Sequence, residues 1–437
     1  MFTNPRSVWL VAACFSIFAA CSADDEDPCP TGGMGTVAVT YTGLPTALDG
    51  PLMLSGVAAD RTLSAAATLT GVASGTWTAT PGRVTAPDAR IRTVYTAVPR
   101  TFCVRAGETT AVEVGWAAVP TSHHLWASNG TGGVGDLLGF VSEVLATSGS
   151  VDPVDVRGAG GVDIAFDREG GLWGLGATTA DAMLVHHDAY SLSATATPDI
   201  EINIAGIDCF PRLNALAIAP NGDLWASSPC APGVVRVLAD ELLRSGLATP
   251  GVTLSGTLAP AGLAFDDAGN LWVAYEGGIV QRFDASTLTA STSTPSRTLS
   301  LKVNSDPLDT SIISVADLAF DASGNLWGSD FGGNSFVRIA AADLAGSGAA
   351  DVVPAVRVSV PLRALLEGIA FDEEGGLWTT YGSGQLARLA PTQLTVSSSA
   401  GSPTAPATII EATDIGYLGA IALYPAPAAL PLFHSLP

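Results

Sequence analysis

Positive charge is scarce in this chain of 437 residues. Lysine and arginine together number 19, against 41 aspartate and glutamate residues, and the only lysine is Lys302. The resulting net charge of −22 repels the phosphates of nucleic acids and anionic lipid headgroups. The composition therefore argues against a nucleic-acid partner and against charge-driven attachment to a membrane.

Several chemical signatures are missing as well. The sequence has no GxSxG nucleophile elbow, no P-loop and no dinucleotide-binding fingerprint. Its cysteines show no CxxC spacing of the kind that binds zinc. Histidine occurs five times, and His186 and His187 end an apolar run where we expect exposure at an outer edge.

Charged residues make up only 14% of the chain, whereas 47% is hydrophobic and glycine and proline number 48 and 28. No helical periodicity runs through the repeated part of the sequence. This composition is typical of a turn-rich all-β protein. The length predicts more than one domain.

An apolar run over residues 8–20 is too short to span a bilayer and ends in small residues before Cys21. The stretch ending at Cys21 resembles a bacterial lipobox, although Phe18 replaces the usual leucine. We therefore predict a signal peptide over residues 1–20 and an outer-membrane or cell-surface lipoprotein anchored through Cys21. Plain secretion is the alternative.

Four further cysteines follow the predicted signal: Cys29, Cys103, Cys209 and Cys230. An even number in an exported chain suggests two disulfides with three possible pairings. We favour the local pairs, Cys29 with Cys103 and Cys209 with Cys230, and unpaired buried thiols are the alternative. Residues 21–35 are acidic and nearly free of apolar side chains, so we expect a flexible tether.

Residues 36–119 contain short alternating runs separated by glycine and proline, which predicts a small antiparallel β-sandwich. The succession GTVAVTYTGLP, LTGVASGTWTAT and VRAGETTAVEVGW resembles prealbumin-like or carboxypeptidase-regulatory-like modules of bacterial surface proteins. That resemblance implies a spacer or adhesion-like domain without catalytic residues.

The rest of the chain repeats one unit. The motif GLAFDDAGNLWV at 262–273 returns in related form, and its copies occupy 162–174, 215–226, 317–328 and 368–379. Leu125-Trp126 is a second half without a first, and GAIALYP at 419–425 is a first half without a second. Tryptophans recur about every 50 residues, a period that indicates a propeller, solenoid or array.

Each copy reads as a strand, a tight turn, a strand beginning Leu-Trp, and two further strands. Four strands in about 50 residues make one propeller blade. We therefore predict a six-bladed β-propeller over residues 120–425, with the first blade closed by the C-terminal strand, and a C-terminal tail over 426–437. Pairing the chain ends in this way removes free sheet edges.

GIAFDEEGGLW and GLAFDDAGNLWVAY resemble the repeats of NHL and SMP-30/gluconolactonase-like propellers, and of streptogramin-lyase-like proteins. The resemblance implies a propeller fold but leaves function open, because this architecture hosts lactonases, lyases, receptors and scaffolds. A streptogramin-lyase-like mechanism would need histidine and glutamate from late blades. The third to sixth repeats contain no histidine, which argues against it.

In SMP-30-like enzymes, side chains at the starts of the innermost strands hold a divalent metal. The corresponding candidates here are Glu367, Asn214, Asp317 and Asp163, whose oxygen ligands would suit Ca²⁺ or Mg²⁺. Glu367 fits the family's Glu-Gly start. Asp163 and Asp317 fall one residue later, where strand alternation would turn them away from the channel. A polar, water-filled channel is the competing interpretation.

The aspartate of each FDxxG turn has a simpler explanation. Asp167, Asp266, Asp321 and Asp372 recur at one turn, whereas a catalytic pair needs unlike environments, so we assign them to turn chemistry. We likewise expect the repeat tryptophans to fill space between blades.

Together these patterns predict a monomeric, non-enzymatic propeller that binds a protein or glycan partner on its face. Contact with the membrane would run through the lipid anchor alone. The competing hypothesis is a divalent-metal-dependent, lactonase-like hydrolase with its site in the central channel.

Overall fold

The computed structural model of the chain describes residues 29–423 apart from short gaps. The gaps are 83, 86–92, 121–124, 130–134, 141, 154, 168–170, 178–181, 189–196, 208–213, 230–232, 257, 307, 331, 362–365, 367, 373, 382–383, 414 and 416. The predicted signal peptide, Cys21, Cys209, Cys230, Glu367 and the tail from 426 lie outside the described residues. The chain divides into two compact units, one of residues up to Gly82 with Ala97–Trp116, and one of Arg83–Thr96 with Ala117 onward.

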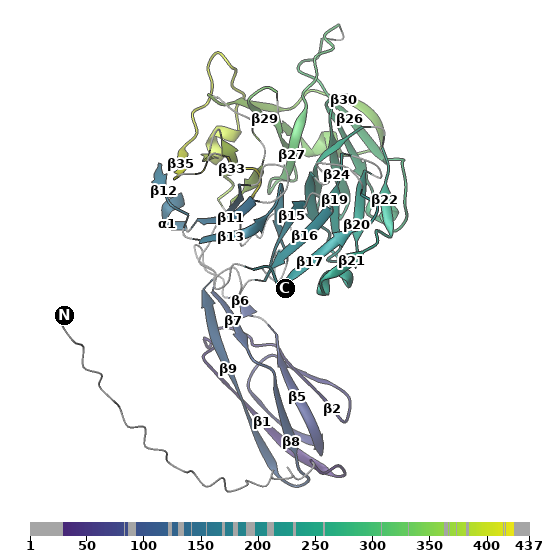
Figure 1. The fold of residues 1–437 in the computed structure, drawn as a ribbon, viewed down its shortest axis with the longest axis vertical. Coiled ribbons are helices and arrows are strands. Elements are labelled where there is room, and N and C mark those ends of the chain that lie inside the picture. The colour runs from purple at the N-terminus through teal and green to yellow at the C-terminus, as the bar shows by residue number, and fades with distance from the viewer. Residues whose placement is uncertain are drawn as a thin grey trace, which may run out of the picture. The chain divides into compact units, whose positions relative to one another are not determined.

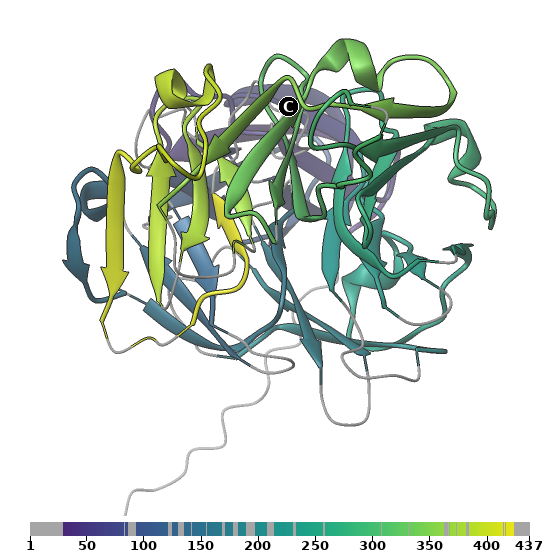
Figure 2. The ribbon, with the colours of Figure 1, turned by 90° about the horizontal axis from the view of Figure 1, so that it is seen from above.

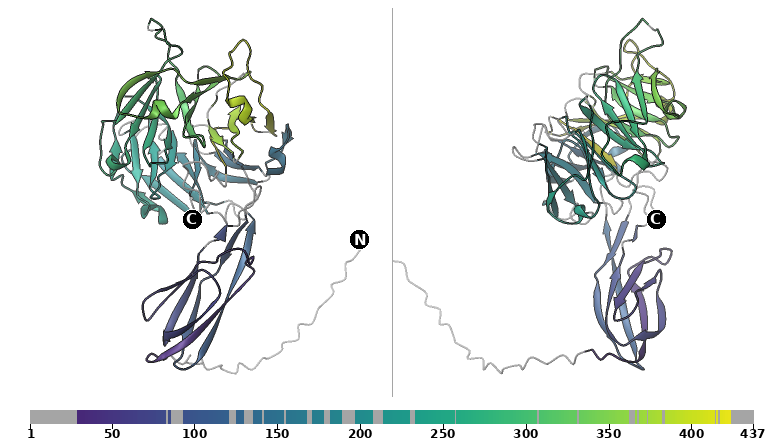
Figure 3. Two further views of the ribbon diagram at one scale, coloured as in Figure 1. Left: turned by 180° about the vertical axis from the view of Figure 1, so that it is seen from behind. Right: turned by 90° about the vertical axis from the view of Figure 1, so that its right-hand side faces the viewer.

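Two sheets are formed by residues up to Pro120 (Figure 3). The first has the order β4 (Ala67–Ala73), β1 (Met34–Thr42), β9 (Thr109–Pro120), β7 (Thr93–Ala97) and β6 (Val84–Thr85). The second has the order β3 (Arg61–Leu63), β2 (Leu52–Gly56), β5 (Gly75–Pro81) and β8 (Arg100–Val104). Alternate side chains of β1 and β5 are buried, which is typical of sheets with one covered face. The domain boundaries drawn from the sequence stay predictions.

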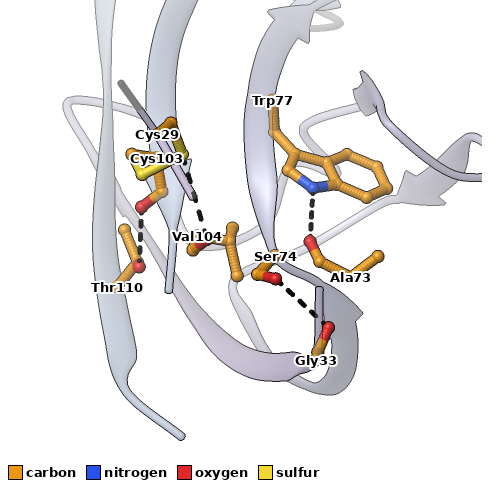
Figure 4. Close-up of a disulfide and its surroundings, with 8 residues drawn as sticks. All are labelled: Cys29, Gly33, Ala73, Ser74, Trp77, Cys103, Val104 and Thr110. Carbon is orange, nitrogen blue, oxygen red and sulfur yellow. Dashed lines mark hydrogen bonds between the residues drawn. A yellow bond between two sulfur atoms is a disulfide. The ribbon is translucent and has the colours of Figure 1, made fainter. Parts of the chain in front are cut away.

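A disulfide joins Cys29 to Cys103 in β8, so this predicted pair is confirmed (Figure 4). Nearby, the Thr110 hydroxyl donates to the Cys103 carbonyl over 3.0 Å. The Trp77 indole donates to the Ala73 carbonyl over 2.8 Å. The disulfide thus ties the start of the described chain to β8, whose neighbour β5 carries the buried Trp77.

The described residues of the second unit form six small sheets, which we number 1 to 6 along the chain (Figure 1). Sheet 1 has the order β13 (Asp155–Gly160), β11 (Gly135–Phe140), β10 (Leu125–Ser128) and β36 (Ile421–Leu423). Sheet 2 comprises β14 (Ile164–Phe166), β15 (Leu172–Ala177), β16 (Ala182–His187), β17 (Ile200–Ile204) and β21 (Gly246–Ala248). Sheet 3 comprises β18 (Ala215–Ile218), β19 (Leu224–Ser227), β20 (Val234–Val237) and β22 (Val252–Leu254).

The remaining three sheets follow the same plan. Sheet 4 comprises β23 (Pro260–Phe265), β24 (Leu271–Tyr275), β25 (Ile279–Phe283), β26 (Arg297–Leu301) and β30 (Gly348–Val352). Sheet 5 comprises β27 (Val315–Phe320), β28 (Leu326–Asp330), β29 (Ser335–Ile339) and β31 (Val356–Ser359). Sheet 6 comprises β32 (Ile369–Phe371), β33 (Leu377–Tyr381), β34 (Gln385–Leu389), β35 (Thr408–Ala412) and β12 (Gly149–Val151).

Short helices follow the third strand of most sheets. They are α1 (Ser142–Leu145), η1 (Glu241–Leu243), η2 (Ala285–Thr287), α3 (Ala341–Leu344) and η3 (Pro391–Leu394). Each carries or directly precedes a buried leucine. Within the described residues, no helix has the length and apolar character needed to cross a bilayer.

The repeated motif forms the hairpin that its sequence predicts. In sheet 4, Asp266 accepts the amides of Asn270 and Ala268, and Gly269 takes a φ of 76°, which a residue with a Cβ rarely adopts. The Asp266 carboxylate also accepts the Trp272 indole N–H over 2.9 Å. The same indole-to-aspartate bond occurs at Trp173, Trp327 and Trp378. The turn role of these aspartates is confirmed.

The repeat tryptophans are buried and pack against the next sheet. Trp272 is 1% exposed and lies in a cluster with Leu318 and Phe320 of sheet 5. Trp327 likewise lies with Phe371 of sheet 6, with ring centroids 6.0 Å apart. The tryptophans therefore fill space between successive sheets, as predicted.

The outer edges of three sheets carry a strand from the following repeat. β21 pairs parallel with β17, β30 with β26, and β12 with β35. At the chain ends β36 pairs antiparallel with β10, so C-terminal strands (yellow) lie beside early strands (blue) in Figure 2. These pairings cover edges that would otherwise invite association with other chains.

Candidate functional site

The predicted channel residues within the described part lie near strand starts, since Asp163 and Asn214 directly precede β14 and β18 and Asp317 is the third residue of β27. Each links two sheets. Asp163 accepts the Ile164 amide with one carboxylate oxygen and the Leu216 amide of sheet 3 with the other, over 2.8 and 2.7 Å. Asn214 donates its side-chain amide to the Pro260 carbonyl of sheet 4 over 3.0 Å. These bonds fasten neighbouring strand starts to one another.

Asp317 repeats the arrangement of Asp163 three sheets further along. Its carboxylate accepts the Leu318 amide over 2.8 Å and the Ile369 amide of sheet 6 over 2.9 Å. Burial raises the pKa of Asp317 to about 7. Burial also raises the pKa of Asp163 well above its usual range, and the charge of Asp317 raises it further. Burial therefore disfavours the charged form of both carboxyl groups.

The metal hypothesis needs three or more ligands that converge. Among the residues the structure describes, histidine, cysteine, aspartate and glutamate form no group of three that could hold a metal ion. The oxygens of Asp163 and Asp317 accept backbone amides, so the described donors fit inter-sheet links better than a cation site. Glu367 lies outside the described residues, and the four-residue ligand set stays a prediction.

A second cluster lies around His186 in sheet 2. His186 Nδ1 lies 3.0 Å from Asp199 Oδ1, and His186 Nε2 lies 3.1 Å from Asp167 Oδ2. Its ring lies against Trp173, with centroids 4.5 Å apart. The two carboxylates raise the pKa of His186 against the opposing effect of burial.

This cluster lines a cleft of about 490 Å³ between sheets 2 and 3, which we call the His186 cleft. Its walls include Asp167, Trp173, His186, Asp188 and Asp199, together with the next turn and the short helix η1. Leu243 at the end of η1 is 77% exposed and belongs to the same lining. The cleft thus combines acidic groups, a histidine and an apolar rim.

The expected exposure of His186 and His187 is wrong, because their exposed fractions are 8% and 0%. The reason is their position in the repeat, because His186 pairs opposite Trp173 and His187 opposite the buried Leu172. The turn of sheet 2 and the next turn, of sheet 3, lie beside His186. Aligning the repeats reveals the position, since arginine occupies it in the four other complete copies, whereas Gly139 lies opposite Trp126 in sheet 1. Those arginines are Arg236, Arg282, Arg338 and Arg388.

Comparisons with known proteins give only distant similarities. No protein-family description and no curated protein matches the chain. A protein of unknown function from Bacteroides caccae has 12% identity and a TM-score of 0.46, over 69% of this chain and 98% of that one. A streptogramin B lyase has 14% identity and a TM-score of 0.37, over 56% of this chain and 72% of that one.

A catalytically inactive virginiamycin B lyase from Staphylococcus aureus has 15% identity and a TM-score of 0.35 over the same shares of the two chains. Similarity at this level assigns no activity to this chain. Membership in the NHL or SMP-30/gluconolactonase-like families stays a prediction.

Proposed function

We propose that this protein is an exported, lipid-anchored binding or scaffold module. In this proposal Cys21 carries the lipid, the N-terminal sheets form a β-sandwich spacer, and a six-bladed propeller closed by β36 presents its face to a protein or glycan partner. The protein acts as a monomer. Membrane contact runs through the lipid anchor alone.

Contacts between one edge strand of each sheet support a closed ring. β14 contacts β18, β18 contacts β23, β23 contacts β27, and β27 contacts β32. β36 contacts both β32 and β14, so the sequence of contacts returns to its start. Six sheets joined in this order are what a six-bladed propeller requires.

One observation carries the preference for binding over catalysis: polar side chains at the strand starts connect sheets. Asp163 reaches Leu216, Asn214 reaches Pro260, and Asp317 reaches Ile369, each in the following sheet. Polar side chains that connect the starts of neighbouring strands have a structural reason to recur in successive repeats. A rigid ring with connecting loops around its face is suited to holding a partner.

The disulfide supports export, because disulfides persist in oxidising compartments outside the cytosol. Metabolic labelling with a fatty-acid analogue tests the anchor. Labelled wild-type protein in the detergent fraction and unlabelled Cys21→Ser support lipidation. Unlabelled wild-type protein in the soluble fraction contradicts it and leaves secretion.

Site-specific photocrosslinking tests the binding face. Leu308 is 88% exposed in the connection that leads into β27, on the strand-start side of sheet 5, whereas Val98 is 84% exposed before β8. A photoreactive residue at Leu308 should capture a defined partner in intact cells, and one at Val98 should not. Equal capture at both positions, or none at either, contradicts the proposed face.

The competing function is a divalent-metal-dependent hydrolase, and the observation in its favour is that burial and the charge of Asp317 together raise the pKa of Asp163. Calorimetry with CaCl₂ and MgCl₂, together with a lactone hydrolysis assay, separates the two functions. Metal binding and hydrolysis lost together in both Asp317→Asn and Glu367→Ala would establish the hydrolase. Heats equal to dilution and no hydrolysis support the binding module.

A further inference from the structure

We propose that the His186 cleft is a binding site for a guanidinium group, and that its ligand is an arginine side chain of a protein partner. The proposal does not depend on the proposed propeller face, because the cleft is built by the turns between sheets 2 and 3.

The corresponding cleft between sheets 4 and 5 has a volume of about 440 Å³. Equivalent residues line both clefts at the tryptophan, at the residue opposite it, in the next turn and in the next short helix. Arg282 holds the place of His186 there, and we call it the Arg282 cleft. Arg282 donates to the carbonyl of Leu344 over 3.1 Å and to that of Gly346 over 2.9 Å. Its guanidinium carbon lies 5.7 Å from the centre of the Trp272 ring.

The repeat between sheets 3 and 4 makes the same kind of contact. Arg236 donates to the carbonyl of Leu288 over 3.0 Å, and Leu288 directly follows η2. Two copies therefore use a guanidinium from one sheet to bond the end of the next short helix. Such bonds satisfy carbonyls that a helix end leaves without partners.

In the His186 cleft the equivalent carbonyl belongs to Leu242. Within the described part of the chain, no arginine reaches it, because His186 is shorter and directs both ring nitrogens to Asp167 and Asp199. An incoming guanidinium would supply the donor that the chain itself supplies in two of the four other copies, through Arg236 and Arg282.

The side of the His186 cleft formed by sheet 2 also has a carboxylate that its counterpart in sheet 4 lacks. The amide of Asp199 donates to the His186 carbonyl, and the amide of Ser296 donates to the Arg282 carbonyl, so the two residues hold equivalent positions. Sheet 2, which lacks the arginine, thus has a carboxylate at the position where sheet 4 has the Ser296 hydroxyl, which accepts from Arg282 over 3.2 Å. Asp188 matches Asp284, which accepts the Arg282 guanidinium over 2.8 Å. Two carboxylates on one side are the partners that a planar guanidinium prefers.

In the next turn the difference is reversed, because there the His186 cleft lacks a carboxylate that the Arg282 cleft has. Ala219 stands in the next turn where Asp321 lines the Arg282 cleft. The carboxylates of the His186 cleft therefore all lie on the side of sheet 2, opposite the exposed Leu243. This arrangement fits an arginine whose neighbouring residues contact an apolar rim, which is why a polypeptide is the expected source.

The test is an NMR titration of the full chain with N-acetylarginine amide and with N-acetylcitrulline amide, which has the same shape without the charge. We expect the arginine compound to bind at least about tenfold more tightly, since one charge-assisted pair is worth about that factor. His186→Arg introduces the residue found in the other copies, and we expect it to weaken arginine binding by at least about tenfold. Equal binding of the two compounds, or unchanged binding in His186→Arg, overturns the proposal.

Two further variants distinguish loss of arginine binding from loss of folding. Asp199→Asn keeps the size of the side chain and should weaken arginine binding, whereas Asp267→Asn in the Arg282 cleft should leave it unchanged, each with its melting temperature measured. Equal losses in both variants overturn the site. An acetylated Leu-Arg-Leu amide tests whether the guanidinium comes from a polypeptide. Tighter binding of this peptide than of N-acetylarginine amide supports a polypeptide ligand, and equal binding overturns the assignment to a protein partner.

Discussion

At the scale of single residues, the aspartate–tryptophan pair of each turn joins local structure to packing. The carboxylate of Asp266 holds the hairpin amides and orients the Trp272 indole, whose ring then fills the space before sheet 5. A buried aromatic ring removed from such a place leaves a cavity that its neighbours fill only in part.

We predict that Trp272→Ala lowers the free energy of unfolding by about 3 to 5 kcal/mol. Asp266→Asn, which retains the ring, should cost only about 1 to 2 kcal/mol. Urea denaturation followed by circular dichroism measures both variants. A loss below about 1 kcal/mol in Trp272→Ala would show that the ring does not fill the space between sheets.

Asp317 should make the stability of the folded protein depend on pH. Its pKa rises from 3.8 to about 7 in the folded protein, so the folded state holds a proton that the unfolded state releases. The resulting stabilisation is complete below 3.8 and is lost as the pH rises towards about 7. Asp317→Asn should flatten the decline of melting temperature across this window. A slope equal to that of the wild type would contradict the assignment.

The sequence predicted these residues unequally. The aspartate turns and tryptophans could be predicted because each recurs in register with a hydrophobic pattern. The burial of His186 was missed because a histidine pair at the end of a run resembles an exposed chain end. Only its alignment opposite Trp173, with arginine in the other copies, identifies the position.

At the scale of elements, hairpins were predictable and edge strands were not. β23 and β24 follow directly from GLAFDDAGNLWV, since turn residues and alternation are local signals. β21 and β12 are three residues long and β30 is five, and each joins a sheet built by another repeat. Such pairing depends on residues distant in sequence, which no local pattern encodes.

The disulfide of the first unit joins distant parts of the chain. Cys29 and Cys103 are separated by 74 residues, and closing a long loop restricts the unfolded chain. We expect Cys103→Ser to lower the free energy of unfolding of the first unit by about 2 to 4 kcal/mol, with the second unit unaffected. Wild-type protein in reductant serves as the control and should match the variant. An unchanged denaturation midpoint in both would contradict a structural role.

In the molecule as a whole, strand pairings join early and late parts of the second unit. The repeat period predicted the number of sheets, and the divided copy predicted that the C-terminal segment joins an early sheet. The additional pairing of β12 with β35 was not predicted. Sheet 1 and sheet 6 are therefore each completed by strands from opposite ends of this unit.

Deleting residues 419–437 tests this dependence, because it removes β36 with the buried side chains of Ile421 and Leu423. At ~25 cal/mol per Å² of apolar surface, the lost burial should cost several kcal/mol, and the bared edge of β10 should promote association. The matched control deletes residues 424–437 only and keeps the whole of β36. We expect the longer deletion to lower the melting temperature and to form oligomers in light scattering, while the shorter one stays monomeric. Two monomeric products of equal stability would show that the ring does not close through this strand.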